Sequence, residues 1–523
     1  MYEQVITSFF TLHPPYLTGY AALTPAVLLL LGLFWGLFAD CLPGKDKGAS
    51  VVGFVCATLA AASSALIMPG TSLFGGRFFY TFDARFAATA ICILAALWCL
   101  WTLGSGVGRS REAIALALAS SIGAILAVAA TDLIVLILAL ELATMPGYVL
   151  IAYRRYRACG LEAALKYFLL SAMATLVMIY GMSFLIGLSA GTTFTALANL
   201  PDTPLTFVAF GLVLIGLFAK LSVAPFHWWA PDACEGAEPW TIAFVSVIPK
   251  ITAVLVIIRI VSVVAPSMPI LDTGAGNISL LSLLMLIIAI ATLVVGAFAA
   301  LTQSDIRRMM AYSGVVNAGY ILIALVIISL GGYHAQNAFY AAVFYIIAYA
   351  FAAMGVLLIA AHEGGKVTNL NGLSDRNPYL AWCLVILALS LIGVPPLLGF
   401  FAKFNLFLVA IDAGQIELVV LAVLIAAVCA FYYLRLVRAA FFGEKPATQE
   451  WAEWTEEAED VDTDADEPAG EVAEFEPADV RDTDIKSPYS FCAHLAIGLI
   501  VAAIIALGIL FQPIINLLTG QLF

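Results

Sequence analysis

The sequence predicts an all-α polytopic membrane protein with about fourteen transmembrane helices. Of its 523 residues, 63% are hydrophobic and only 11% are charged, and the mean hydropathy is +1.03. Soluble domains carry about 25% charged residues, so this composition excludes an ordinary soluble protein. A helix needs about 20 mostly apolar residues to cross the bilayer core. The segments that meet this length begin near residues 18, 51, 84, 113, 133, 162, 205, 239, 278, 310, 336, 379, 415 and 489.

The loops between these spans predict the orientation of the chain. With the N-terminus outside, the outer loops carry only Arg77 and Arg85. Cytoplasmic loops of membrane proteins carry the excess of Lys and Arg, so we expect both termini outside a cell (cytoplasmic or inner) membrane. We expect no removable signal peptide, because the N-terminus lacks a positive region and a cleavage site before the first span. The basic residues of the inner loops are Lys45, Lys47, Arg109, Arg111, Arg154, Arg155, Arg157, Arg307, Arg308, Lys366, Arg376, Lys445, Arg481 and Lys486.

The net charge of −12 comes from one segment. Residues 444–486 hold 17 acidic and 3 basic residues, so the rest of the chain is slightly positive. A segment this charged, with few aliphatic residues, does not bury enough surface to fold alone. We predict a disordered acidic cytoplasmic insertion at 443–487.

Two blocks of five spans have a related design. Each block has a basic inner loop and a fourth helix interrupted by proline near a lysine: Lys220 with Pro225, and Pro395–Pro396 with Lys403. Interrupted hydrophobic segments at corresponding positions of two halves indicate inverted repeats. We therefore predict two inverted five-helix repeats with broken helices 7 and 12. The predicted units are spans 1–3 at 1–111, the first repeat at 112–265, the second repeat at 278–442, the acidic insertion at 443–487 and a last span at 488–523.

Glu141 and four lysines lie inside apolar stretches of predicted spans. Charged groups at bilayer depth are costly and by default indicate ion or proton pathways. Glu141 lies about nine residues into an apolar run, Lys220 precedes the break at Pro225, and Lys250 follows Pro249. Burial favours release of a proton from an ammonium and a nearby carboxylate favours retention, so movement of one partner can switch the other. A static Lys–Glu ion pair that joins two helices is the alternative.

The other two lysines differ from each other. Lys403 lies beyond its proline break in the outer half of span 12, where it is a candidate for proton release. Lys166 stands four residues after Glu162, so either an i,i+4 ion pair or a supporting relay role fits it. His227 could link the break to the inner surface because histidine titrates near neutral pH, but a histidine beside tryptophans can equally be a packing residue.

Cofactor motifs are not evident in the sequence. Its nine cysteines are scattered, without a CxxC pair or the spacing of a zinc or iron–sulfur site. The glycine-rich GSGVG at 104–108 lacks the spacing of a nucleotide loop. We expect no cofactor, no metal and no nucleic-acid partner for this chain.

Four strings resemble the antiporter-like membrane subunits of respiratory complex I, and among them subunit N. They are LALELATMPGYVLIAYRR with EAALKYF, KLSVAPFHWWAPDACEGAEPWTIAFVSVIPK, LTQSDIRRMMAYSGVVNAGYIL and NGLSDRNPYLAWCLVILALSLIGVPPLLGFFAKF. The EGA at 235–237 belongs to a turn whose sequence differs in the sister subunits. The chain departs from the pattern at Cys234 (usually tyrosine), at Glu238, and at Asn317, where many relatives have histidine.

The resemblance implies a proton-translocating subunit of a NADH-quinone-oxidoreductase-like translocase. Its functional glutamate and lysines map onto Glu141, Lys166, Lys220, Lys250 and Lys403. Quinone, flavin and iron–sulfur clusters would belong to partner subunits, and the partners would be sister antiporter-like subunits and small membrane subunits in the lipid bilayer. Two alternatives remain at this stage: a subunit of an Mrp-type cation/proton antiporter, and a non-pumping scaffold subunit.

Overall fold

The computed structural model describes residues 18–38, 48–105, 111–153, 158–268, 270–272, 277–443, 491–512 and 515. Of the acidic insertion predicted at 443–487, residues 444–487 lie outside these ranges, as do most of the basic inner-loop residues. Within them, thirteen helices are long and apolar enough to cross a membrane. A further span is made of two shorter helices, α17 (Pro378–Ile392) and α18 (Leu398–Asp412). The fold class is therefore confirmed, and each span begins within about one helical turn of its predicted start.

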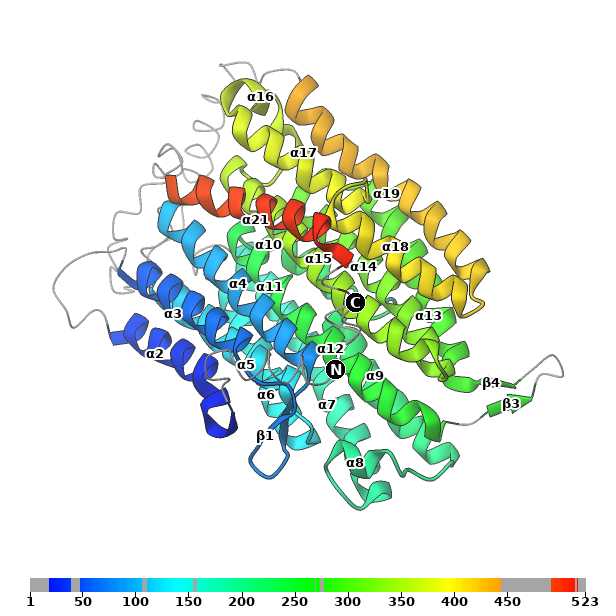
Figure 1. The fold of residues 1–523 in the computed structure, drawn as a ribbon. Helices are drawn as coiled ribbons and strands as arrows, with labels where there is room; N and C mark the ends of the chain where they lie inside the picture. The colour runs from blue at the N-terminus through cyan, green and yellow to red at the C-terminus, as the bar shows by residue number, and fades with distance from the viewer. Residues whose placement is uncertain are drawn as a thin grey trace, which may run out of the picture.

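The chain runs through these spans in order (Figure 1). Two antiparallel hairpins are the β-structure of the described residues: β1 (Thr71–Leu73) with β2 (Phe78–Tyr80), and β3 (Ile270–Asp272) with β4 (Asn277–Ser279). The helices are η1 (Gly19–Leu23), α2 (Thr24–Phe38), α3 (Gly48–Ala65), α4 (Phe82–Ser105), α5 (Arg111–Ala129), α6 (Leu133–Ile151), α7 (Ala158–Ser189), α8 (Phe194–Leu197), α9 (Pro204–Leu221), α10 (Trp229–Gly236), α11 (Pro239–Val245), α12 (Ile248–Val264), η4 (Ala265–Ser267), α13 (Leu280–Leu301), α14 (Ile306–Leu330), α15 (His334–Glu363), η5 (Val367–Leu370), α16 (Leu373–Arg376), α17 (Pro378–Ile392), α18 (Leu398–Asp412), α19 (Ile416–Phe442) and α21 (Phe491–Ile509).

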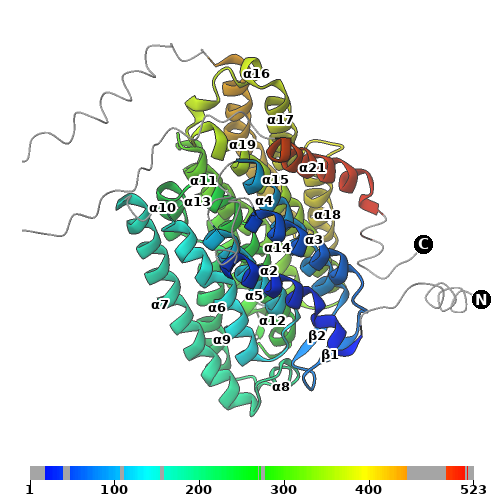
Figure 2. The same cartoon turned by 90° about the vertical axis from the view of Figure 1, so that its left-hand side faces the viewer.

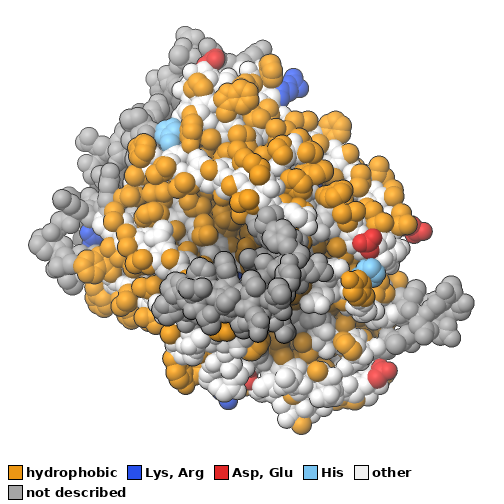
Figure 3. All heavy atoms as spheres, in the orientation of Figure 1, with side chains coloured by type: hydrophobic (Ala, Val, Ile, Leu, Met, Phe, Trp, Pro, Cys, Tyr) orange, Lys and Arg blue, Asp and Glu red, His pale blue; other side chains and the backbone are white. Residues whose placement is uncertain are grey.

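Three spans form the interior of the bundle. These are α14, α15 and the span that α11 and α12 form together, and all three are almost wholly buried. By contrast, α7 and α19 are buried over less than half of their length. Figure 2 shows α7 along one edge of the bundle, and α21 packs against α4, α15 and α18. On the face seen in Figure 3, hydrophobic side chains are spread widely over the described surface and charged side chains are few.

Three spans are interrupted. The first interruption separates α9 from α10 and contains Pro225, and the second separates α17 from α18 and contains Pro395 and Pro396. The third lies between α11 and α12, where Pro249 occupies the first turn of α12. Proline removes a backbone donor and clashes with the preceding turn, which explains why helices end here. The predicted breaks in spans 7 and 12 are confirmed, and the relation of the two blocks as inverted repeats stays a prediction.

Glycines allow some of these helices to approach closely. A β-carbon on Gly123 of α5 would overlap the backbone of α6 at Leu142 and Ala143. A β-carbon on Gly211 of α9, by contrast, would have no neighbouring atom within 4 Å. We expect Gly123→Ala to lower the stability of the purified protein by about 1–3 kcal/mol, because a backbone does not move aside as a side chain does.

The measurement for Gly123→Ala is the midpoint of thermal unfolding in detergent. Gly211→Ala is the matched control, because alanine is favoured over glycine in an unobstructed helix. An unchanged midpoint for Gly123→Ala would contradict the tight contact between α5 and α6.

Candidate functional site

Glu141 and Lys220 form an ion pair between α6 and α9. Lys220 Nζ lies 2.8 Å from Glu141 Oε1 and 3.3 Å from Thr144 Oγ1. Thr175 of α7 also donates to Glu141 Oε1, at 2.8 Å. The Lys220 side chain is only 2% exposed and that of Glu141 is 23% exposed. The pair thus joins an enclosed ammonium to a carboxylate that is partly open to the surroundings.

The end of α9 holds Lys220 beside the break. Ser222 closes the helix with φ of 61°, and the Val223 N–H donates to the Phe218 carbonyl at 2.9 Å. The indole of Trp229, at the start of α10, donates to the Ala219 carbonyl at 2.9 Å. Carbonyls released by the proline break need such partners inside a membrane protein. The two halves of span 7 are therefore tied together at the level of the lysine.

Lys250 lies in the first turn of α12, against α14. It is buried, and its Nζ occupies space that Gly314 leaves open, since a β-carbon on Gly314 would collide with this ammonium. The same β-carbon would lie 3.2 Å from the Tyr349 hydroxyl of α15. Among the described residues, no hydrogen bond or ion pair to Lys250 Nζ is found. The Lys250 ammonium is therefore held by packing against Gly314, and not by an ion pair with a described carboxylate.

Asn317 lies one turn further along α14 and connects several hydroxyl groups. Its Nδ2 donates to the Ser313 carbonyl at 2.7 Å, and Tyr345 of α15 donates to its Oδ1 at 2.5 Å. The Ser313 hydroxyl in turn hydrogen-bonds the Tyr433 hydroxyl of α19. Asn317 is thus a fixed, non-titrating group between three helices.

Lys403 reaches back across the second break. It lies in the second turn of α18, and its Nζ donates to the carbonyls of Leu391 at 2.7 Å and Ile392 at 3.0 Å, at the end of α17. The ammonium also lies 5.3 Å from the centre of the Tyr320 ring. A cation is stabilised by a helix C-terminus and by an aromatic face. The described residues place no carboxylate in an ion pair with Lys403.

A hollow of about 10 Å³ separates Asn317 from Lys403. This volume is close to the minimum for one water molecule. Polar groups of Asn317, Tyr345, Ser390 and Lys403 line it. Asn317, Ser313, Tyr345 and Tyr433 thus form a hydrogen-bonded polar strip that meets Lys403 at this hollow. Lys250 lies next to it, because Tyr349 also lines the hollow and its hydroxyl adjoins Gly314, against which the Lys250 ammonium packs.

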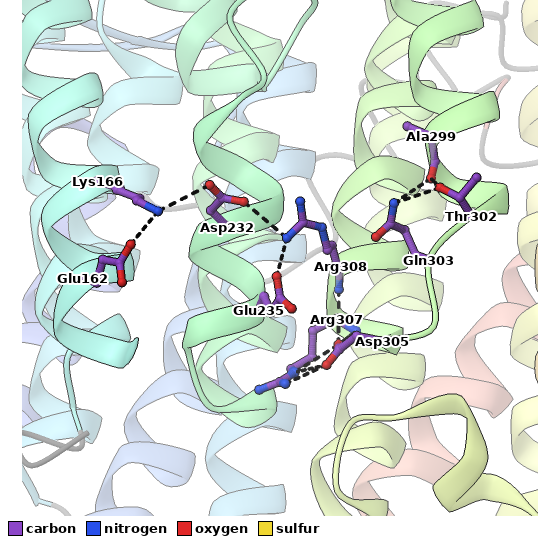
Figure 4. Close-up of polar contacts among 10 residues, drawn as sticks. All are labelled: Glu162, Lys166, Asp232, Glu235, Ala299, Thr302, Gln303, Asp305, Arg307 and Arg308. Atoms are coloured by element: carbon purple, nitrogen blue, oxygen red, sulfur yellow. Dashed lines mark hydrogen bonds and ion pairs between the residues drawn. The ribbon is translucent and has the colours of Figure 1, made fainter. Parts of the chain in front are cut away.

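Lys166 lies outside this strip. Its side chain is 46% exposed and its Nζ lies 2.7 Å from Glu162 Oε1, so the i,i+4 pair is formed. Asp232 of α10 is 3.7 Å away and also pairs with Arg308 of α14 (Figure 4). Lys166 belongs to a surface ion-pair network that links α7, α10 and α14.

The EGA turn connects α10 to its neighbours, and the contacts explain the glutamate and the glycine. Glu235 pairs with Arg308, and the Ala237 carbonyl accepts from Arg307 Nη1 at 3.0 Å. A β-carbon on Gly236 would lie 2.5 Å from that of Ala163 on α7, so only glycine permits this approach. The turn fixes the second half of span 7 against both blocks.

His227 lies in the break between α9 and α10 and is half-buried. Its ring centre is 6.3 Å from those of Trp228 and Tyr312. The described structure does not join it to the three buried lysines through hydrogen bonds, so its relay role stays a prediction. Sequence inspection missed Thr144, Thr175 and Tyr345, because hydroxyl residues are common in membrane helices and carry no distinctive spacing.

Among the described residues, no group of three His, Cys, Asp or Glu side chains is placed to hold a metal ion. The eight cysteines within those ranges are free thiols.

Buried lysines beside interrupted helices, in a bundle of this size, define an antiporter-like membrane subunit. The family described as NADH:quinone oxidoreductase/Mrp antiporter, transmembrane region, matches residues 130–429. NADH-quinone oxidoreductase subunit N of Nitrosomonas europaea is 31% identical over 448 residues, which cover 81% of this chain and 89% of that protein. Subunit N 2 of Opitutus terrae is 34% identical over 450 residues, covering 82% and 90%. The chain belongs to the NADH-quinone oxidoreductase subunit N family.

Solved structures agree with this fold. A chain of respiratory complex I from Thermus thermophilus, with bound aureothin, has a TM-score of 0.72 at 26% identity and covers 94% of this chain and 98% of its own length. A chain of the Mrp complex from Dietzia sp. DQ12-45-1b has a TM-score of 0.75 at 21% identity, covering 96% of both chains. At that identity the Mrp likeness shows the fold alone. Among the alternatives, the relatives favour subunit N over an Mrp antiporter subunit.

Proposed function

We propose that this chain translocates protons in the membrane arm of a complex I-type NADH-quinone oxidoreductase, and that its buried Glu141, Lys220, Lys250 and Lys403 carry them. The observation that supports this most directly is that three buried lysines, Lys220, Lys250 and Lys403, each lie beside an interruption of a membrane-spanning helix. Each ammonium lies at a helix interruption, and two of the three have no carboxylate partner among the described residues. A purely structural role would favour paired charges, because an uncompensated buried charge costs stability.

The proposed order begins at the Glu141–Lys220 pair, whose carboxylate is partly exposed. Glu141 and Lys220 control proton loading: when the pair separates, desolvation favours release of the Lys220 proton. Lys250 passes protons along the strip, through hydroxyl groups and one water in the hollow. Lys403 releases them on the outer side, in the predicted orientation with both termini outside.

The redox chemistry belongs to other subunits in this proposal. Quinone, flavin and iron–sulfur clusters would be held by partners, with sister antiporter-like and small membrane subunits adjoining this chain. The chain's task is then to couple quinone reduction elsewhere to proton movement in the cell membrane.

Gly314→Ala tests the proposed path without removing any charged group. The new methyl group would displace the Lys250 ammonium, so we expect proton pumping per quinone reduced to fall several-fold. A general acid–base group contributes about 10²–10⁴-fold only when it is correctly placed. The purified complex is reconstituted in liposomes, and internal acidification is recorded together with quinone reduction.

Gly211→Ala is the control for this experiment, since its methyl group meets no atom within 4 Å. Undiminished pumping by an assembled Gly314→Ala complex would contradict the placement of Lys250 on the path.

A further inference from the structure

A chain of three aromatic side chains lies beside the Glu141–Lys220 pair. The rings of Tyr167 in α7 and Trp229 in α10 are stacked, with their centres 4.2 Å apart and an angle of 12° between their planes. Tyr167 also meets the Tyr148 ring of α6 edge to face, with centres 4.6 Å apart. All three side chains are buried. Helix α7 packs against both α6 and α10 (Figure 2), so these rings join three helices.

Both ends of this aromatic chain lead back to the ion pair. At one end, the Trp229 indole donates to the Ala219 carbonyl at 2.9 Å, and Ala219 directly precedes Lys220 in α9. At the other end, Tyr148 lies seven residues after Glu141 in α6. Residues at this spacing share one face of a helix. The ion pair and the rings therefore form a closed circuit of contacts through α6, α7, α10 and α9.

The indole hydrogen bond is the link in this circuit that depends on tryptophan. A phenyl ring could stack on Tyr167, because stacking needs only an aromatic face, but it has no N–H group to donate. The Ala219 carbonyl also accepts from the Ser222 N–H at 3.2 Å. Loss of the indole donor would therefore leave this carbonyl with a partner, and its main effect would be to free the end of α9 from α10.

We propose that Trp229 is a positioning residue, which acts with the Tyr167 stack to fix the distance between Lys220 and Glu141. Such a role depends on the proposed function, in which separation of that pair controls proton loading. The aromatic chain limits how far the end of α9 moves from α6, so the ammonium returns to its carboxylate after each separation. A shift of α10 is transmitted to Lys220 by the same contacts.

Trp229→Phe tests this role in the complex reconstituted in liposomes. We expect the complex to assemble and reduce quinone, while pumping per quinone reduced falls several-fold, because small displacements of a reacting group are costly. The pH at which pumping is half-maximal should shift by about one unit, because the distance to the Glu141 carboxylate determines how firmly Lys220 holds its proton. A residue that only stabilises the fold would not move this pH profile.

Trp98→Phe is the matched control. Trp98 is buried in α4, and its indole donates to the Trp240 carbonyl of α11 at 2.8 Å, so this variant loses the same kind of hydrogen bond elsewhere in the bundle. We expect similar decreases in the midpoint of thermal unfolding for both variants, but normal pumping and an unchanged pH profile for Trp98→Phe. Tyr167→Phe retains the stacked ring and should pump as the wild type does, whereas Tyr167→Leu should behave as Trp229→Phe does.

Three results would overturn the proposal: normal pumping by Trp229→Phe, a loss of pumping without any shift of the pH profile, and an equal loss in Trp98→Phe. Lys220→Met distinguishes the positioning role from the proposed function. If Lys220→Met pumps normally, the proposed function fails; if it loses pumping while Trp229→Phe does not, only the positioning role fails. If Trp229→Phe does not assemble, the comparison of Tyr167→Leu with Tyr167→Phe decides the outcome.

Discussion

Replacing Lys220 by methionine is expected to lower proton pumping at least about tenfold while the complex still assembles and reduces quinone. Methionine fills a similar volume but carries no proton, and Lys220 is the enclosed member of the Glu141 pair. The measurement is acidification of liposomes that contain the reconstituted complex. Lys166→Met serves as the comparison, because Lys166 is 46% exposed and paired with Glu162 at the surface; we expect it to retain most of the pumping.

A double variant separates function from structure at this pair. Lys220→Met alone leaves the Glu141 carboxylate without its cation, which could destabilise the protein. Glu141→Gln combined with Lys220→Met removes both charges while retaining a side chain that accepts from Thr175. If the pair only holds α6 and α9 together, this double variant should pump normally. Assembly with pumping still lost is the result that the proposed function requires.

The main features of the fold could be predicted from the sequence because a bilayer imposes a simple rule on it. Every spanning helix must be long and apolar, so span positions follow from hydropathy. The breaks at Pro225 and Pro395–Pro396 follow from proline chemistry. Proline also precedes Lys250, yet the short α11 and the gap before α12 are visible only in three dimensions.

The candidate site was only partly predictable. Charged residues within apolar runs are rare, so Glu141, Lys220, Lys250 and Lys403 were identified as candidates from sequence. Pairing of Glu141 with Lys220 was also anticipated, and the two are in contact. The hydroxyl and carbonyl partners were not, because these depend on tertiary contacts between distant spans.

Two residues, Lys166 and Asn317, show what could not be predicted from the sequence. Lys166 occurs in an equally apolar run, but its side chain points towards Glu162 and Asp232 at the surface. The structural consequence of Asn317, at a position where many relatives have histidine, could not be predicted from the sequence. Asn317 is held by Ser313 and Tyr345 beside a hollow of about 10 Å³, so non-titrating hydroxyl and amide groups surround the position at which many relatives have a histidine.

Lys403→Gln is expected to have the second large effect. Glutamine can still donate a hydrogen bond from its amide to the carbonyls at the end of α17, but it carries no titratable proton. The carbonyls of Leu391 and Ile392 therefore keep a donor, which limits the loss of stability that an unsatisfied buried acceptor would cause, about 1–3 kcal/mol. We expect quinone reduction and assembly to persist, while acidification per quinone falls at least about tenfold.

Glutamine at position 403 distinguishes two roles of the lysine. One role is proton release, and the other is hydrogen bonding to the carbonyls at the end of α17. If Lys403 serves only to bind the two carbonyls across the break, Lys403→Gln should pump as the wild type does, whereas Lys403→Met should unfold or assemble poorly. If Lys403 carries protons, both variants should lose pumping, and only the methionine variant should also lose thermal stability. Lys366→Gln, at an exposed lysine on a connecting segment, controls for loss of a positive charge. Normal pumping by complexes that carry Lys403→Gln or Lys220→Met would instead support a non-pumping scaffold subunit. In such a subunit the buried charges have no transport role, so replacing them leaves proton pumping by the complex unchanged.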